Sequence, residues 1–254
     1  MSIPELSILI IILAFLCEYI DSSLGMGYGT TLTPVLLIMG YSPLQVVPCI
    51  LLSELISGLS AAFFHHKMKN ANFKAGTKDF KVAVVLAATS IFGTTIAIFV
   101  ALTLPSLYVK LYIGILVFAM GALILLTRKK NFPFSWKKIS GLGLVAAFNK
   151  GISGGGYGPI VTSGQLLSGM NSKAAVGITS LAEGLTCFVG VGGYLLFTNN
   201  TVDWSLAPSL VIGAFLSVPL AVFTVRMVKE KQLRLIIGFA TLCLGLLTLG
   251  KVIL

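Results

Sequence analysis

The sequence predicts an all-α protein that crosses a membrane several times and consists of two inverted repeats. Three observations predict this fold: an apolar composition, basic residues confined to short clusters, and an internal repeat with glycine-rich breaks. Hydrophobic residues make up 56% of the 254 residues, charged residues make up 10%, and the mean hydropathy is +0.99. Soluble domains carry about 25% charged residues because water must solvate their surface. The composition therefore excludes an ordinary soluble enzyme.

The charged residues are mostly basic, with 18 Lys and Arg against 8 Asp and Glu. They gather at 67–81, 128–138 and 226–234, and long stretches almost without charge separate these clusters. Cytoplasmic loops of membrane proteins show this pattern. We therefore expect the lipid bilayer, and no nucleic acid, as the partner of this basic chain.

The first half of the chain contains six successive segments. An apolar run, a glycine-rich break, a short apolar segment, a long helix and two further spans are expected at 3–24, 25–29, 30–39, 42–64, 82–102 and 108–127. The long helix has a clear start, because Ser42 can cap it and Pro43 suits its first position. The segment at 30–39 is too short for a span, which needs about 20 residues.

The second half repeats this order. The corresponding segments are expected at 139–152, 154–158, 160–168, 171–197, 205–225 and 233–253. Each glycine-rich break with its flanking segments predicts a re-entrant hairpin whose tip lies inside the membrane, because irregular backbone at that depth must face protein or a water-filled cavity. The sequence thus predicts six full spans and two hairpins.

The repeat is visible as residue identity. A shift of 129 residues places identical residues opposite each other at ten positions within 21–59, among them Gly25 with Gly154, Tyr28 with Tyr157 and Glu54 with Glu183. About three identities are expected for this composition. Towards the repeat ends the shift becomes 124, which pairs Gly121 with Gly245. The repeats are expected at 1–127, with a hairpin tip at 21–30, and at 139–254, with a tip at 150–159.

The basic clusters fix the expected orientation of the repeats. If all three clusters are cytoplasmic, the loops at 103–107 and 198–204 face outside and 128–138 is a cytoplasmic linker. The second repeat then starts inside, whereas the first starts outside. Inverted repeats with glycine-interrupted segments at matching positions are typical of secondary transporters, and the interruptions indicate the binding site.

The two breaks are the first candidate site. Glycine leaves backbone N–H groups uncovered, and the start of a helix carries a partial positive charge, so both tips suit an anion. The alternative is close helix packing through small residues. The candidate substrate-binding residues are Ser22, Gly25, Gly27, Tyr28, Gly29, Thr30, Lys150, Ser153, Gly154, Gly155, Gly156, Tyr157 and Gly158.

Charged residues within apolar segments are the second candidate group. Glu54 and Glu183 lie in the middle of matching long helices, where a carboxylate is costly unless it has a function. Each is expected either to carry a proton or to accept hydrogen bonds from a hairpin tip. Lys150 is the counterpart of Asp21, so it either pairs with Asp21 or contacts the substrate. Glu18 has no charged counterpart.

Two other residue types are expected to be inert. The four cysteines all lie in apolar runs without a C-x-x-C pair, so they are expected to be small buried side chains. His65 and His66 lie at a helix end beside Lys67 and are expected to be solvated. No motif for a metal, a cofactor or ATP is present, so none of these is expected.

The sequence resembles the TauE/SafE sulfite-exporter family, which is also grouped with toluene-sulfonate uptake permeases. The segments IDSSLGMGYGTTLTP at 20–34 and NKGISGGGYGP at 149–159 carry the resemblance, together with the short and long helices after each. The first segment has fewer glycines than the family pattern. The resemblance covers nearly the whole chain and implies transport of sulfite, thiosulfate, a sulfonate such as sulfoacetate, or a related anion.

The sequence therefore predicts a secondary transporter in the bacterial inner membrane that exports a small sulfur-containing anion. The anion is expected near the midplane between the two tips, with protons as a coupling ion. Two alternatives remain. A cation transporter would use Glu18, Asp21, Glu54 and Glu183 as ligands, and a membrane-embedded enzyme would use Asp21, Glu54 and Glu183 on a lipid-borne substrate.

We predict that both termini face the periplasm, because the three basic clusters face the cytoplasm. A reporter that is active only in the cytoplasm, fused after Leu254, should give no signal. The same reporter inserted at 128–138 is the positive control. A strong signal from the fusion at Leu254 would contradict the inverted repeat.

Overall fold

The computed structural model describes residues 7–41, 43–101, 106–126, 133–153, 156–197 and 202–253, and this part of the chain is helical without strands. The helices follow the predicted order in both halves. They are α1 (Ile8–Leu24), α2 (Tyr28–Ile38), α3 (Pro43–Lys67), α4 (Lys78–Ala101), α5 (Ser106–Leu126), α6 (Trp136–Ser153), α7 (Tyr157–Leu167), α8 (Ser172–Phe197), α9 (Ala207–Met227) and α10 (Glu230–Ile253).

The glycine-rich breaks end one helix and begin the next. Gly25 has a φ of 73° and closes α1 by donating its N–H to the carbonyl of Asp21, and Gly27 follows with a φ of 127°. In the second half, Gly156 precedes α7 with a φ of 79°. Positive φ costs glycine little and strains other residues, so Gly25 and Gly27 explain why α1 stops at its break, and Gly156 explains where α7 begins.

Four helices in the described part of the chain are long and apolar enough to cross a membrane. They cover Gln45–Lys67, Lys78–Ala97, Ser172–Leu196 and Ala207–Met227. Together with the helical content, these spans make the chain a polytopic membrane protein. The two other predicted spans are also helical, as α5 and α10, which have 21 and 24 residues.

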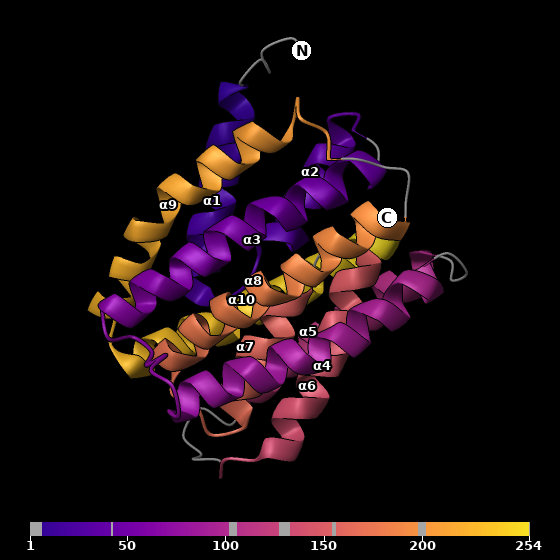
Figure 1. The fold of residues 1–254 in the computed structure, drawn as a ribbon. Coiled ribbons are helices and arrows are strands. Elements are labelled where there is room, and N and C mark those ends of the chain that lie inside the picture. Colours follow the sequence, from indigo (N-terminus) through magenta and orange to yellow (C-terminus); the bar gives the residue numbers. More distant parts are fainter. Residues whose placement is uncertain are drawn as a thin grey trace.

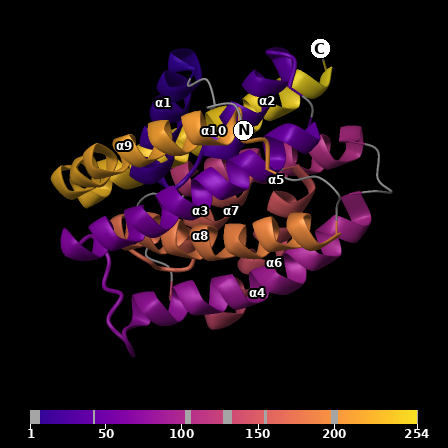
Figure 2. The same ribbon diagram turned by 45° about the horizontal axis from the view of Figure 1, so that its top comes forward.

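Helices from the two halves pack against each other throughout the molecule. Figures 1 and 2 both show α1 beside α9, α3 beside α8, and α4 beside α6, and α5 packs against α10. In the predicted correspondence of the halves, α1 matches α6 and α9 matches α4. The pair α1 with α9 therefore has a counterpart in the pair α6 with α4.

The contact between α5 and α10 is reciprocal. A Cβ atom added to Gly121 would lie 2.7 Å from the Cα of Leu242, and one added to Gly245 would lie 2.5 Å from the Cα of Phe118. The shift of 124 that pairs Gly121 with Gly245 also pairs Phe118 with Leu242. Position 118 thus lies near 245 while 121 lies near 242, so the two helices run antiparallel.

The helices α3 and α8 also pack against each other in antiparallel orientation. A Cβ atom added to Gly58 would lie 2.9 Å from the carbonyl oxygen of Ser180, and one added to Gly190 would lie 3.1 Å from the Leu51 side chain. The partner number falls as the position along α3 rises, so α3 and α8 are antiparallel. Glycine allows the two backbones to approach this closely, as in other membrane helix pairs.

We predict that Gly121→Val and Gly245→Val each destabilise the protein by about 1–3 kcal/mol, which is typical of overpacking a tight contact. Valine at either position would push α5 and α10 apart. Gly192→Val is the matched control, since a Cβ atom there meets nothing within 4 Å. Thermal unfolding in detergent measures the effect. Equal melting temperatures for all three variants would contradict the close α5–α10 contact.

Candidate functional site

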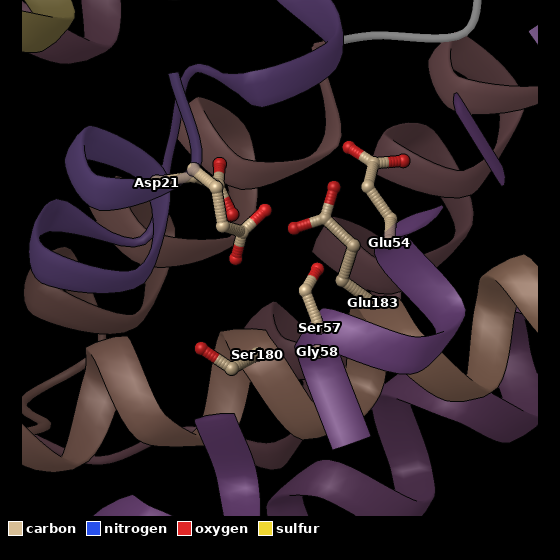
Figure 3. A pocket seen from close by; sticks show the side chains of 7 residues that line it. Asp21, Glu54, Ser57, Gly58, Ser180 and Glu183 are labelled. Carbon is tan, nitrogen blue, oxygen red and sulfur yellow. The ribbon is translucent and has the colours of Figure 1, made fainter. Parts of the chain in front are cut away.

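Four buried carboxylates gather around one small cavity in the middle of the protein. Figure 3 shows Asp21, Glu54 and Glu183 directed towards the same space, which Glu18 also lines. The cavity has a volume of about 10 Å³, and each of the four side chains is at most 8% exposed. A cavity of roughly this volume holds about one water molecule. Ser57, Gly58 and Ser180 complete its wall.

Lys150 bridges two of these carboxylates. Its Nζ lies 2.7 Å from Oε1 of Glu183 and forms a second ion pair with Oε2 of Glu54. Lys150 is 2% exposed, so the ammonium is almost fully removed from solvent. The expected alternative of an ion pair between Lys150 and Asp21 is therefore wrong. The ammonium pairs with Glu54 and Glu183, which match each other in the repeat, and not with Asp21.

The crossing of α3 and α8 explains why the two glutamates meet. Glu54 lies one helical turn before Gly58, and Glu183 directly precedes Gly184. A Cβ atom added to Gly184 would lie 3.1 Å from the backbone nitrogen of Leu59, so the helices touch at these glycines. Lys150 lies in the last turn of α6, where a cation also interacts favourably with the helix dipole.

Asp21 acts within its own repeat. Its Oδ1 accepts the backbone N–H of Tyr28 at 3.2 Å, and Tyr28 is the first residue of α2. A carboxylate at this position satisfies an unpaired amide and complements the positive helix end. Glu18 lies nearby, and its Oε1 accepts the hydroxyl of Ser22 at 2.6 Å. Asp21 therefore holds the start of α2 at the first break.

The two breaks lie directly against each other. Thr162 in α7 donates its hydroxyl to the carbonyl of Gly25 at 2.7 Å, and the N–H of Gly156 donates to Thr30 Oγ1 at 3.0 Å. A Cβ atom added to Gly158 would lie 2.5 Å from the carbonyl oxygen of Gly25. Gly158 is thus the position that lets the start of α7 contact the end of α1.

Several predicted substrate-binding groups already have partners within the protein. The N–H groups of Gly25, Tyr28 and Gly156 donate to Asp21, Asp21 and Thr30 respectively. The phenol oxygens of Tyr28 and Tyr157 lie 2.8 Å and 3.4 Å from the hydroxyls of Ser53 and Ser90.

The second break is only partly described. Gly154 and Gly155 lie outside the described residues, and the side chain of Ser153 is not described. The structure therefore locates the second tip through Gly156, Tyr157 and Gly158. It places Gly27 and Gly29 on either side of the first residue of α2.

Sequence reasoning missed four residues at the site. Ser57 and Ser180 line the cavity from positions three residues away from Glu54 and Glu183. This spacing places each serine on the same helix face as its glutamate, which is a signal that could have found them. Cys187 contacts Oε2 of Glu54 at 3.5 Å, and Thr162 bridges the two breaks. Cys243, in contrast, is exposed rather than buried.

His65 is buried, and the expectation that it is solvated is wrong. Its Nε2 lies 3.3 Å from the carbonyl oxygen of Ser22, and its Nδ1 lies 3.2 Å from Nδ2 of Asn70. Asn70 also donates to the carbonyl of Val222 at 3.0 Å. Because an amide nitrogen only donates, Nδ1 accepts and the proton lies on Nε2. His65 therefore caps a carbonyl that the break in α1 leaves without a helical partner.

The cluster combines surplus negative charge with very little solvent. Four ionised carboxylates and one ammonium would give a formal charge of −3, which an apolar interior does not tolerate without protons or a bound cation. Oε1 of Glu54 and Oε2 of Glu18 are buried and have no hydrogen-bond partner among the described residues. These two oxygens therefore offer positions where protons could neutralise part of the surplus charge.

Comparisons with known proteins identify the kind of protein. The sequence profile of the family described as "Sulfite exporter TauE/SafE" matches residues 10–248. A relative in Bacillus subtilis (strain 168), "Probable membrane transporter protein YtnM", is 27% identical over 244 residues, which cover 90% of this chain and 79% of the relative. No solved structure shows significant similarity. These matches indicate a membrane transporter rather than an enzyme.

We predict that Lys150→Met destabilises the protein by about 3–5 kcal/mol, because removing one partner leaves buried charges unpaired. Adding Glu54→Gln and Glu183→Gln to Lys150→Met should restore most of this loss. The matched control adds Asp21→Asn to Lys150→Met and should restore little, because Asp21 does not pair with Lys150. Melting temperatures in detergent decide. Recovery by Asp21→Asn alone would contradict the observed ion pairs.

Proposed function

We infer that the chain, which belongs to the sulfite exporter TauE/SafE family, is a secondary transporter of a small sulfur-containing anion. Sulfite, thiosulfate and sulfonates such as sulfoacetate are the proposed substrates. The proposed location is the bacterial inner membrane. The proposed substrate position is near the midplane, between the two breaks and close to the carboxylate cavity. Export is the proposed direction.

One observation carries the choice of an anion: a buried ammonium lies at the end of the helix that leads into the second break. Lys150 is the last-turn residue of α6, directly before the second glycine-rich segment. Its two partners, Glu54 and Glu183, are the protein's own anions. A sulfur oxyanion offers the same kind of oxygen acceptors as these carboxylates. We propose that the substrate takes their place on Lys150.

We propose that the substrate also takes the place of a carboxylate at the start of α2. The Tyr28 N–H holds the Asp21 carboxylate in this structure, and a substrate oxygen could occupy that position when Asp21 moves away. The amides of Tyr157 and Gly158 lie at the start of α7, and helix starts favour anions. The Gly156 N–H would join them by leaving Thr30 Oγ1. The proposed binding groups are therefore Lys150 and the amides of both tips.

Proton coupling follows if the substrate competes with Glu54 and Glu183 for Lys150. A protonated Glu54 or Glu183 attracts Lys150 less strongly, so proton binding makes the ammonium available to the substrate. Protons and anion would then occupy the site together. If fewer protons than negative charges move, the membrane potential drives the complex outwards, with about 2.3 kcal/mol per net charge at 100 mV. This difference is the proposed driving force for export.

The packing of the helices supports the inverted repeat. Matching helices contact each other in antiparallel orientation, at α3 with α8 and at α5 with α10. A two-fold axis along the membrane normal would make such matching helices parallel, whereas an axis in the membrane plane makes them antiparallel. We propose repeats at 1–127 and 139–254 joined by a cytoplasmic linker at 128–138.

The position of Lys150 also bears on the cation alternative. A cation transporter would use the carboxylates of Glu18, Asp21, Glu54 and Glu183 to hold its substrate. Two of these four already hold the ammonium of Lys150. Only Glu18 and Asp21 are then left to hold a cation, and the Asp21 carboxylate already accepts the Tyr28 N–H. The ammonium also weakens the attraction of the cluster for a second cation, and this favours an anion as the substrate.

Proteoliposomes test the proposal. We expect saturable transport of sulfite, thiosulfate or sulfoacetate, and weaker transport of carboxylates of similar size. Transport should rise as pH falls, since protons release Lys150. Glu54→Gln and Glu183→Gln should each insert normally and lose part of the pH dependence. Each should transport at least about 10-fold more slowly, because glutamine mimics the protonated acid and cannot ionise again to displace the substrate from Lys150.

Glu230→Gln is the matched control for these variants. Glu230 is an exposed carboxylate in the first turn of α10, outside the cavity, and glutamine there still offers an acceptor to the Ser172 N–H that Glu230 binds. It should leave both rate and pH dependence unchanged. Transport of cations instead of anions, or wild-type rates for both cavity variants at every pH, would overturn the proposed function.

A further inference from the structure

A second, much larger hollow lies apart from the carboxylate cavity. It has a volume of about 510 Å³ and is open to the surface of α5, α6 and α7. Its walls are mainly apolar, with Met120, Leu142, Val145, Ile160 and Leu167 among the lining residues. None of its lining residues lines the carboxylate cavity. We call this hollow the α5–α7 groove.

One end of the α5–α7 groove is basic. Lys137 and Lys138 line it there, and both side chains are exposed. They belong to the basic cluster at 128–138, which adds three more Arg and Lys residues to the same stretch of chain. Trp136 precedes them and is 43% exposed. An exposed Trp beside Lys residues is typical of the boundary between the hydrocarbon and the headgroups.

The floor of the groove is left open by a glycine. Gly141 lies one helical turn after Lys137 and Lys138, and a Cβ atom added there would meet nothing within 4 Å. Leu142 and Val145 continue along α6 as half-buried side chains. The groove thus runs from a charged end to an apolar interior, and this distribution matches an amphipathic ligand.

We propose that the α5–α7 groove binds a phospholipid with an anionic headgroup, such as phosphatidylglycerol. The headgroup phosphate pairs with Lys137 and Lys138, and an acyl chain lies along Leu142, Val145 and Ile160. Charge complementarity selects this occupant, because a neutral lipid or a detergent tail brings no net negative charge to the two ammonium groups. Basic pockets between membrane helices on the cytoplasmic side recognise such headgroups. The proposal is independent of the transported substrate.

Fluorescence quenching tests the lipid site. The chain has two Trp residues, so a Trp204→Phe background leaves Trp136 as the reporter beside the groove. We expect brominated phosphatidylglycerol to quench Trp136 in detergent at concentrations at least 10-fold below those needed for brominated phosphatidylcholine. Lys137→Gln with Lys138→Gln should weaken the phosphatidylglycerol affinity about 30-fold, at about 1 kcal/mol for each Lys.

Two further variants test the apolar part of the groove and the specificity of its basic end. Gly141→Phe should abolish the high-affinity quenching without lowering the melting temperature, because the ring fills open space. Lys229→Gln with Lys231→Gln removes two exposed charges elsewhere and should leave the quenching unchanged. The proposal is overturned if the Lys137/Lys138 variant binds like this control. It is also overturned if glycerol 3-phosphate, which lacks acyl chains, displaces the lipid at equal concentration.

Discussion

The whole centre of the protein depends on one ammonium group shared by two carboxylates from different helices. Lys150 contacts Glu54 on α3 and Glu183 on α8, and all three side chains are almost completely buried. In an apolar environment none of the three could remain ionised alone. The close approach of α3 and α8 at Gly58 and Gly184 is what brings the two glutamates within reach of one lysine.

The two halves use the same backbone plan for different chemistry. Asp21 and Lys150 occupy matching positions before their breaks, yet they carry opposite charges. Asp21 binds the first amide of its own α2, whereas Lys150 binds glutamates on α3 and α8. A repeat with two acids would add one more negative charge to a cavity that already has surplus carboxylates. The Lys in the second half therefore reduces the surplus negative charge of the cluster and makes the site asymmetric.

The helices could be predicted from the sequence because apolar runs and glycine-rich breaks are each visible within a short stretch of residues. The breaks at Gly25 and Gly156, the short α2 and α7, and the family were all predicted from residue type and spacing. The partners of Lys150 and the burial of His65 were not predicted, because both depend on how helices that are distant in sequence cross each other. Lys150 lies 33 residues from Glu183 in sequence, and only the α3–α8 contact determines which carboxylates it meets.

The packing also limits how the two halves can move relative to each other. The broken helix α1 packs along α9 in parallel orientation, with Ser7 contacting Ser209 and Tyr19 contacting Thr224. The broken helix α6 packs along α4 in the corresponding way. Each helix that ends at a glycine-rich break therefore packs against a helix from the other half, so the two halves are interlocked and do not form separate bodies. Positive-φ glycines at the two breaks, Gly25 and Gly156, are the points where the backbone can bend most easily, and Lys150 lies in the last helical turn before the second break. Movement at the breaks would then reach Lys150 directly, without first separating the two halves.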